Sequence, residues 1–247
     1  MVAGGAVDEA VEIARECRQL DVGLHLVVCQ GRSVMAADRL DGLVDTARNF
    51  ANQPAAAGMR YFFDRRVRLA LQAECEAQVV RHLEMVGCLN HIDGHLNFHV
   101  HPVIANIVID LAIRYHVPYL RLPREPVMTT LRLARDKAPR KLMEAVIFHL
   151  LARRASRQMK AHGIGSTDAL YGLHQSGNQS ERYVLGVIDR LRDGLTEFYF
   201  HPTIGPTSDD EREVKLLTST VVREALERAK VELTSFGEIA REASNSR

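Results

Sequence analysis

The chain of 247 residues carries 32 Lys and Arg against 31 Asp and Glu, a formal net charge of +1. Hydrophobic residues make up 46% of it and charged residues 26%, which is typical of a globular protein and excludes a disordered chain. The balanced charge argues against nucleic acid as a partner of the whole chain. No apolar run reaches the roughly 18 residues of a membrane span, and the first residues lack the features of a signal peptide. The four cysteines form no CxxC pair, so we expect reduced thiols and a cytoplasmic location.

Apolar residues alternate along the chain between the spacing of helices and the continuous runs of buried strands. Ser208 and Glu211 form a capping box, which predicts a helix start. The alternation predicts an α/β protein, with a parallel sheet or barrel and helices outside it, in a single domain over 1–247. The expected elements, in chain order, are a helix over 7–19, a strand over 22–28, a loop over 31–64, a helix over 65–86, a strand near 89–93, a helix from Pro102, a strand over 118–123, a helix over about 140–160, a strand-like segment over 167–173, a helix near 179–192, a strand-like segment over 197–202 and a helix after Ser208.

Histidines are concentrated in one segment. Five of the eleven lie between residues 91 and 116, and four of these belong to HIDGHLNFHVH at 91–101. Polar and apolar residues alternate strictly there, which predicts an extended chain with all polar side chains on one face. A helix would instead group His91, His95 and His99, but the alternation and an internal glycine count against it.

Crowded imidazoles indicate a binding site, because neutral imidazole is the commonest protein ligand for divalent transition metals. Asp93 lies among them and can fix the tautomer of a ligand histidine. A single histidine is more often a core residue bonded to a carbonyl, but a cluster of four has no structural use. We therefore predict that some members of the cluster bind metal or substrate.

Two more histidines belong to apolar runs. His25 lies inside VGLHLVV, and His201 follows EFYF and precedes Pro202. A lone histidine in a strand is more often structural, but functional side chains of βα folds gather at the carboxyl ends of parallel strands. The segments around His25, residues 91–101 and His201 together favour a common site.

These motifs resemble those of the YdjC-like (ChbG-type) carbohydrate deacetylases. The resemblance rests on GLHL around His25, on HIDGHxxxHxHP from His91, and on the strand before His201, in the family's order and spacing. The segments MVAGGAVDEAVEIAR, HLNFHVHP, RLPREP and GLTEFYFHP are most similar to the hopanoid-biosynthesis-associated branch. The resemblance implies a TIM-barrel-like (β/α) barrel. It also implies hydrolysis of the N-acetyl group of an amino sugar, such as N-acetylglucosamine linked to a glycolipid or hopanoid.

The resemblance also implies roles for single residues. His25 and His95 correspond to the family's two metal-ligating histidines, and the divalent ion is usually described as Mg²⁺, although two imidazoles also suit Zn²⁺. In the catalytic set, Asp93 is expected to orient a ligand and His201 to act as the general acid that protonates the leaving amine. Substrate contacts are expected at His99, His101 and Arg121.

The start of the sequence departs from the family pattern. Family members begin with a strand that ends in an Asn-Ala-Asp-Asp-Phe-Gly-type motif, which supplies an acidic metal ligand, and nothing before His25 matches it. We therefore expect a barrel that lacks its first βα unit in this chain. The alternative function is a non-catalytic pseudoenzyme or a sugar-binding protein that lost this motif. A metallophosphoesterase is a weaker third hypothesis, because Asp93 alone joins the histidines.

The stretch 121–160 carries eleven Lys and Arg against three acidic residues. Leu142, Val146 and Leu150 form an apolar stripe on the same predicted helix as many of these cations. The favoured interpretation is a stripe that faces the core and a basic face in solvent. A basic amphipathic helix can also lie on an anionic membrane, so peripheral membrane contact through 140–160 is the alternative. An oligomer is left open.

Overall fold

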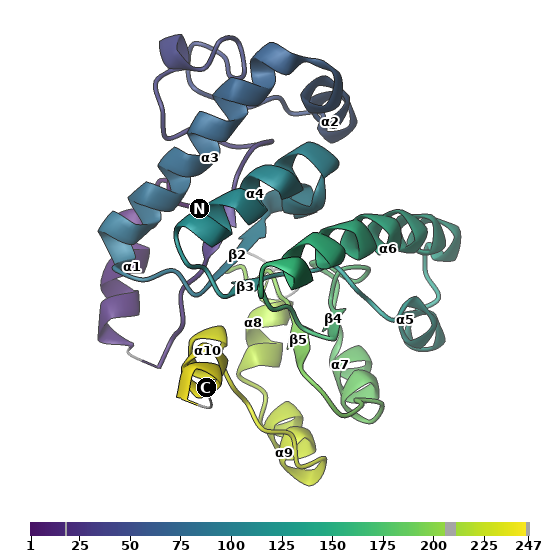
Figure 1. Ribbon diagram of the computed structural model, residues 1–247. Coiled ribbons are helices and arrows are strands. Elements are labelled where there is room, and N and C mark those ends of the chain that lie inside the picture. The colour runs from purple at the N-terminus through teal and green to yellow at the C-terminus, as the bar shows by residue number, and fades with distance from the viewer. Residues whose placement is uncertain (18, 206–210, 246–247) are drawn as a thin grey trace. The chain divides into compact units, whose positions relative to one another are not determined.

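The computed structural model describes residues 1–17, 19–205 and 211–245 and divides into two compact units (Figure 1). Each unit contains a small parallel sheet with helices, which confirms the α/β class. The closed barrel and the single domain stay predictions. Unit 1 consists of residues 1–121, 153–166 and 234–247, and unit 2 of residues 122–152 and 167–233.

Unit 1 is built on three parallel strands in the order β1–β2–β3. In their register, His25 lies opposite Asp93, and His91 lies opposite Tyr119. Helix α3 packs against α2, α4 and β1, and Figure 1 shows α3 and α4 side by side. The elements are α1 (Val7–Glu16), β1 (Leu24–Leu26), η1 (Ala37–Arg39), α2 (Pro54–Phe63), α3 (Arg65–Val86), β2 (His91–Gly94), η2 (His95–Val100), α4 (Pro102–Arg114), β3 (Tyr119–Leu120) and α10 (Phe236–Asn245).

Helix α3 buries a polar stripe beside its apolar face. The Gln78 amide binds the backbone of Val27 at both ends: its Oε1 accepts from the Val27 N–H at 2.9 Å, and its Nε2 donates to the Val27 carbonyl at 2.7 Å. Glu74 accepts from the backbone N–H groups of Val34 and Met35 at 2.8 and 2.9 Å. The two side chains therefore fix the chain that follows β1, the strand that carries His25.

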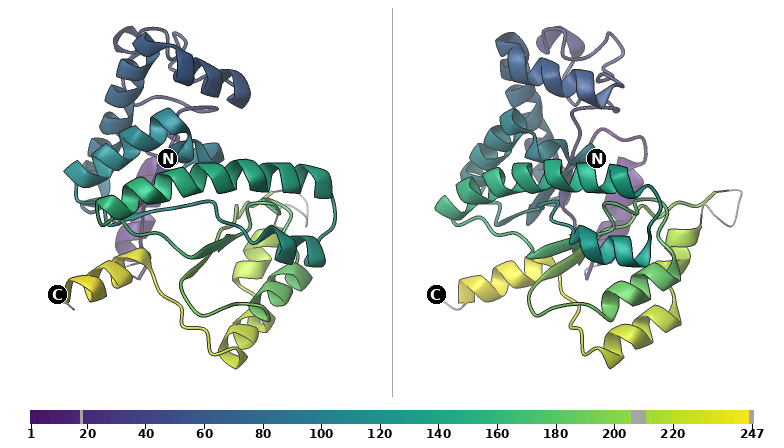
Figure 2. Two further views of the ribbon diagram at one scale, coloured as in Figure 1. Left: turned by 45° about the vertical axis from the view of Figure 1, so that its right-hand side comes forward. Right: turned by 90° about the vertical axis from the view of Figure 1, so that its right-hand side faces the viewer.

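Unit 2 contains two parallel strands, β4 and β5, and a separate hydrophobic core. Helix α7 packs against α5 and α9, as Figure 2 also shows. The buried core residues are Tyr171, Tyr183, Val184, Val187, Ile188, Leu216 and Ala225. The elements are α5 (Val127–Leu133), α6 (Ala138–Ala161, which ends in unit 1), β4 (Ala169–Tyr171), α7 (Glu181–Ile188), β5 (Thr196–Phe198), α8 (Arg212–Leu217) and α9 (Thr220–Arg228).

Most predicted elements are confirmed, although the strands are shorter than expected. The predicted helix over 65–86 coincides with α3. The loop predicted over 31–64 is wrong at its end, where α2 forms. The helix could not be recognised from its sequence, because it buries only Ala57 and Tyr61 and so needs no continuous apolar stripe at helical spacing. Ser208 lies outside the described residues, and its capping role stays a prediction.

The extended chain predicted for residues 91–101 holds only as far as Gly94. The next six residues form 3₁₀ turns, in which Leu96 and Asn97 have φ angles of 53° and 57°. This left-handed conformation is easier for Asn than for Leu, and it breaks the alternation of faces. The polar side chains of the segment therefore do not share one face.

The favoured interpretation of α6 is wrong for its apolar stripe and for Lys141, whereas Arg153, Arg154, Arg157 and Lys160 are exposed as expected. Its apolar stripe is exposed, while Lys141, expected on the basic face, is buried and bound to Asp136 at 2.9 Å. Ala152, Ala155 and Met159 lie on the buried face instead, and the two alanines allow close packing. Among the described helices, none has both the length and the apolar character needed to span a membrane.

Replacement of Glu74 with Ala should destabilise the protein. The substitution leaves the amides of Val34 and Met35 without their acceptor, and each buried unsatisfied group costs about 1–3 kcal/mol. We expect the free energy of unfolding to fall by about 2–4 kcal/mol in a urea titration followed by circular dichroism. Glu84→Ala, at an exposed position of the same helix, is the control and should change it by less than about 0.5 kcal/mol. Equal losses in both variants would contradict the prediction.

Candidate functional site

Asp93, on β2, lies at the centre of a polar cluster in unit 1. Its Oδ1 accepts a hydrogen bond from Nδ1 of His25 at 2.9 Å, and its Oδ2 forms an ion pair with the guanidinium of Arg121. The parallel register explains the first contact, because His25 is the β1 partner of Asp93. Arg121 directly follows β3. The central strand of the sheet thus holds one side chain from each neighbouring strand.

The charge of this carboxylate is fixed by its neighbours. Burial by itself raises the pKa of Asp93, but the hydrogen bond from His25 and the positive charge of Arg121 outweigh burial and hold the pKa well below its usual value. Asp93 is therefore ionised at neutral pH and can only accept hydrogen bonds. It keeps the His25 proton on Nδ1, which leaves the lone pair on Nε2 for a ligand.

His95 brings a second imidazole next to the first. The ring centroids of His25 and His95 are 5.7 Å apart, and the rings are inclined by 73°. Two imidazoles on one tetrahedral ion, with bonds of about 2.1 Å, have centroids about 5 Å apart. The pair is therefore close to the geometry of two ligands of one divalent ion. Within the described residues, no group of three or more His, Cys, Asp and Glu side chains is placed to hold an ion.

His99 is buried, with 3% of the residue exposed. Its Nε2 donates to the carbonyl of Arg121 at 2.9 Å, so it supports the backbone that carries this arginine. Burial lowers the pKa of His99 to about 4, and the ring is neutral at pH 7. Gly94 makes room for it, because a Cβ at Gly94 would lie 3.0 Å from the His99 Cβ and Nδ1. The predicted contact of His99 with substrate stays a prediction.

His101 lies among aromatic residues. Its Nδ1 accepts from the Val103 N–H at 3.4 Å, which caps α4, and its ring stacks on Phe98 with centroids 6.2 Å apart. His91, on β2, packs instead against Phe236 with centroids 4.6 Å apart. The substrate role predicted for His101 stays a prediction.

His201 follows β5 in unit 2. Its Nδ1 lies 3.1 Å from the hydroxyl of Ser176, its backbone N–H donates to Glu213, and its ring meets Tyr199 edge-on. Sequence reasoning missed Ser176 and Glu213, which carry no motif. Because His201 and Asp93 belong to different units, the role of His201 as general acid stays a prediction.

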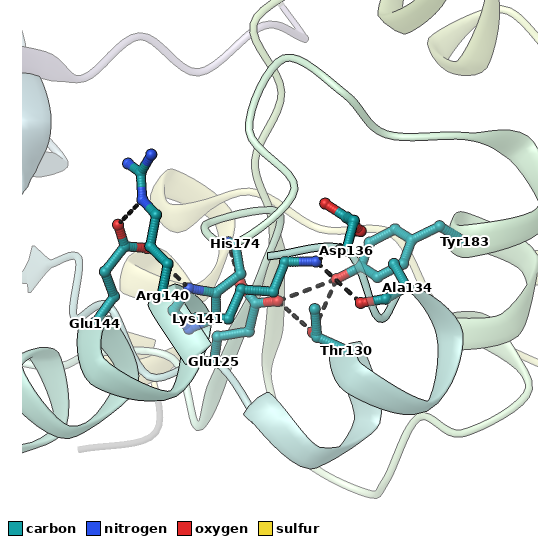
Figure 3. Close-up of polar contacts among 9 residues, drawn as sticks. All are labelled: Glu125, Thr130, Ala134, Asp136, Arg140, Lys141, Glu144, His174 and Tyr183. Atoms are coloured by element: carbon teal, nitrogen blue, oxygen red, sulfur yellow. Dashed lines mark hydrogen bonds and ion pairs between the residues drawn. The ribbon is translucent and has the colours of Figure 1, made fainter. Parts of the chain in front are cut away.

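A second polar network, within unit 2, was not predicted (Figure 3). Glu125 accepts hydrogen bonds from the hydroxyls of Thr130 and Tyr183 and from the backbone N–H of His174 at 3.0 Å. It thereby ties α5 and α7 to the loop after β4. The only sequence signal was an acidic residue between the prolines of RLPREP.

The same network holds the start of α6. Lys141 donates to the carbonyl of Ala134 and to Asp136, each at 2.9 Å. The side chain of His174 is almost fully buried, and its Nδ1 lies 3.5 Å from Glu144 (Figure 3). These contacts join α6 to the chain on either side of it in unit 2, which is a structural role.

Asp93→Ala should destabilise the protein by about 3–5 kcal/mol, because it leaves the partly buried guanidinium of Arg121 without its anion. The double variant Asp93→Leu with Arg121→Met removes both charges and should recover most of this loss. Urea unfolding of the single and double variants measures both effects. A double variant as unstable as the single one would show that packing, not the unpaired charge, is responsible.

Comparison with known proteins finds similar sequences among proteins named carbohydrate deacetylase. The carbohydrate deacetylase of Vibrio cholerae serotype O1 (strain O395) is 32% identical over 121 residues, which cover 48% of this chain and 44% of that protein. The chain thus spans about half the length of the bacterial relatives that it matches. The carbohydrate deacetylase of Mus musculus is 29% identical over 204 residues, 79% of this chain and 62% of that protein. That of Homo sapiens is 25% identical over 271 residues, 97% of this chain and 80% of that protein.

A solved structure shares the fold. A crystal structure from Enterococcus faecalis V583, described as a candidate cellobiose-phosphate cleavage protein, matches with a TM-score of 0.70 at 21% identity. The match covers 97% of this chain and 85% of that one. The family model described as YdjC-like protein matches residues 1–228. The chain therefore belongs to the YdjC-like protein family.

Proposed function

We propose that the protein is a metal-dependent carbohydrate deacetylase that hydrolyses the N-acetyl group of an amino sugar. The observation that carries the proposal is the Asp93–His25–His95 arrangement, found in a chain whose relatives are named carbohydrate deacetylases. A sugar-binding protein has no need of an ionised carboxylate that orients one imidazole beside another. The enzyme is therefore better supported than the non-catalytic alternative.

His25 and His95 would hold the divalent ion. The family resemblance favours Mg²⁺, whereas two imidazoles are softer ligands that suit Zn²⁺. When bound, such an ion supplies Lewis-acid polarisation of the acetamide carbonyl. Asp93 keeps Nε2 of His25 unprotonated, and Arg121 keeps Asp93 ionised. In this proposal the main role of Arg121 is its ion pair with Asp93. A contact between Arg121 and the substrate is a further expectation.

Cleavage of the amide requires a proton for the leaving amine. His201 is the proposed donor, since Ser176 lies at its Nδ1 and leaves Nε2 to exchange a proton. The proposed substrates are N-acetylglucosamine oligosaccharides and N-acetylglucosamine carried on a lipid of the hopanoid type. The lipid-linked substrate is proposed because RLPREP and GLTEFYFHP resemble segments of the hopanoid-biosynthesis-associated branch of the family.

Acetate release tests the proposal. The purified protein, supplied with Mg²⁺ or Zn²⁺, should release acetate from N-acetylglucosamine oligosaccharides or from a glycolipid that carries this sugar. His25→Ala and His95→Ala should each lower kcat/KM by more than about 100-fold, because loss of a proposed ligand costs at least as much as loss of a group that orients one.

His162→Ala, at an exposed position after α6, is the matched control and should keep its activity. Unfolding curves show whether each variant is folded. Failure of both substrate classes with both ions would contradict the proposed function. Equal activity of the His25 and control variants would remove His25 from the site.

A further inference from the structure

Helix α6 exposes a broad apolar face. Four residues of its buried face are Lys141, Ala152, Ala155 and Met159. Folded proteins rarely leave a contiguous patch of large apolar side chains in water, and such patches mark contact surfaces. The exposed residues, with their exposed fractions, are Leu142 (45%), Met143 (59%), Val146 (62%), Ile147 (48%) and Leu150 (60%).

Cations continue this face along the helix. With 3.6 residues per turn, Arg153 and Arg157 lie two turns beyond Val146 and Leu150, and Arg154 lies one turn beyond Leu150. These arginines and Lys160 are exposed, and none pairs with a carboxylate in the described part of the chain. The single acidic residue of α6, Glu144, is already bound by Arg140 at 2.6 Å. Figure 2 shows α6 as one unbroken helix.

We propose that this face of α6 binds the surface of an anionic lipid bilayer. The lipid-binding face consists of Leu142, Met143, Val146, Ile147, Leu150, Arg153, Arg154, Arg157 and Lys160. Apolar side chains of such a helix enter the boundary between headgroups and acyl chains, while arginines bind lipid phosphates. One bilayer surface offers both an apolar interior for these side chains and phosphates for the arginines, so no shaped groove is required. The inference does not depend on the proposed deacetylase activity.

A second copy of the chain fits this face less well. Two copies that meet through α6 would each bring the same four cations, which repel one another unless the helices are offset. An anionic bilayer instead attracts every one of these cations, and each Lys or Arg near such a surface contributes about five-fold to binding. The charge of the face therefore favours lipid over self-association.

Vesicle flotation of the full chain tests the inference. The protein should bind vesicles of phosphatidylcholine with phosphatidylglycerol, and hardly bind vesicles of phosphatidylcholine alone. Added salt should weaken the binding, because it screens exposed charges. The variant Arg153→Gln/Arg154→Gln/Arg157→Gln should partition about 100-fold more weakly. Val146→Gln/Ile147→Gln should also lose binding, through its apolar side chains.

Matched variants on α3 serve as controls. Arg65→Gln/Arg66→Gln removes exposed cations, and Leu69→Gln removes a side chain that is 73% exposed, and neither should change partitioning. Equal binding to neutral and anionic vesicles, or full binding by the triple arginine variant, would overturn the inference. A dimer in light scattering that Val146→Gln/Ile147→Gln dissociates, without vesicle binding, would assign this face to a second copy.

Discussion

The buried carboxylate of Asp93 is the interaction on which the arrangement in unit 1 depends. It lies on the central strand and binds one side chain from each neighbour, His25 from β1 and Arg121 after β3. Desolvation offsets much of the attraction in a buried ion pair, so such a pair contributes little net stability but is demanding in geometry. Its effect is orientation: it sets the tautomer of His25 and the place of Arg121 at once.

Close backbone approach makes this arrangement possible. A Cβ at Gly23 would lie 2.2 to 2.4 Å from ring atoms of His91, so the glycine before Leu24 and His25 lets β2 pack against β1. Directly after β1, the Gln78 side chain hydrogen-bonds to both the N–H and the carbonyl of Val27. The GLHL motif is thus explained by packing as well as by chemistry. Its glycine admits a neighbouring ring, and its histidine faces the carboxylate.

The sequence predicted those features that depend on local pattern. Helix α3, the strand around His25 and the hydrogen bond between Asp93 and a histidine follow from periodicity and from the chemistry of imidazole. The turns after Gly94 could not be predicted, because they need the left-handed backbone of Leu96, which a leucine adopts only under tertiary constraint. The sequence pattern also failed to predict which face of α6 is buried, since Ala152, Ala155 and Met159 lie on the packed face and the apolar stripe is exposed.

The polar side chains of both units lie in or just after the short parallel strands. In unit 1, His25 lies in β1, His95 directly follows β2 and Arg121 directly follows β3. In unit 2, His174 follows β4 and His201 follows β5 by three residues each. Parallel strands leave their last carbonyl and amide groups at one edge, where the chain turns and side chains can converge without disturbing the ladder. Polar side chains thus lie within the strands of unit 1, as His25 and Asp93 do, and directly after strands in both units, while the apolar side chains of the strands are buried or partly buried in each unit.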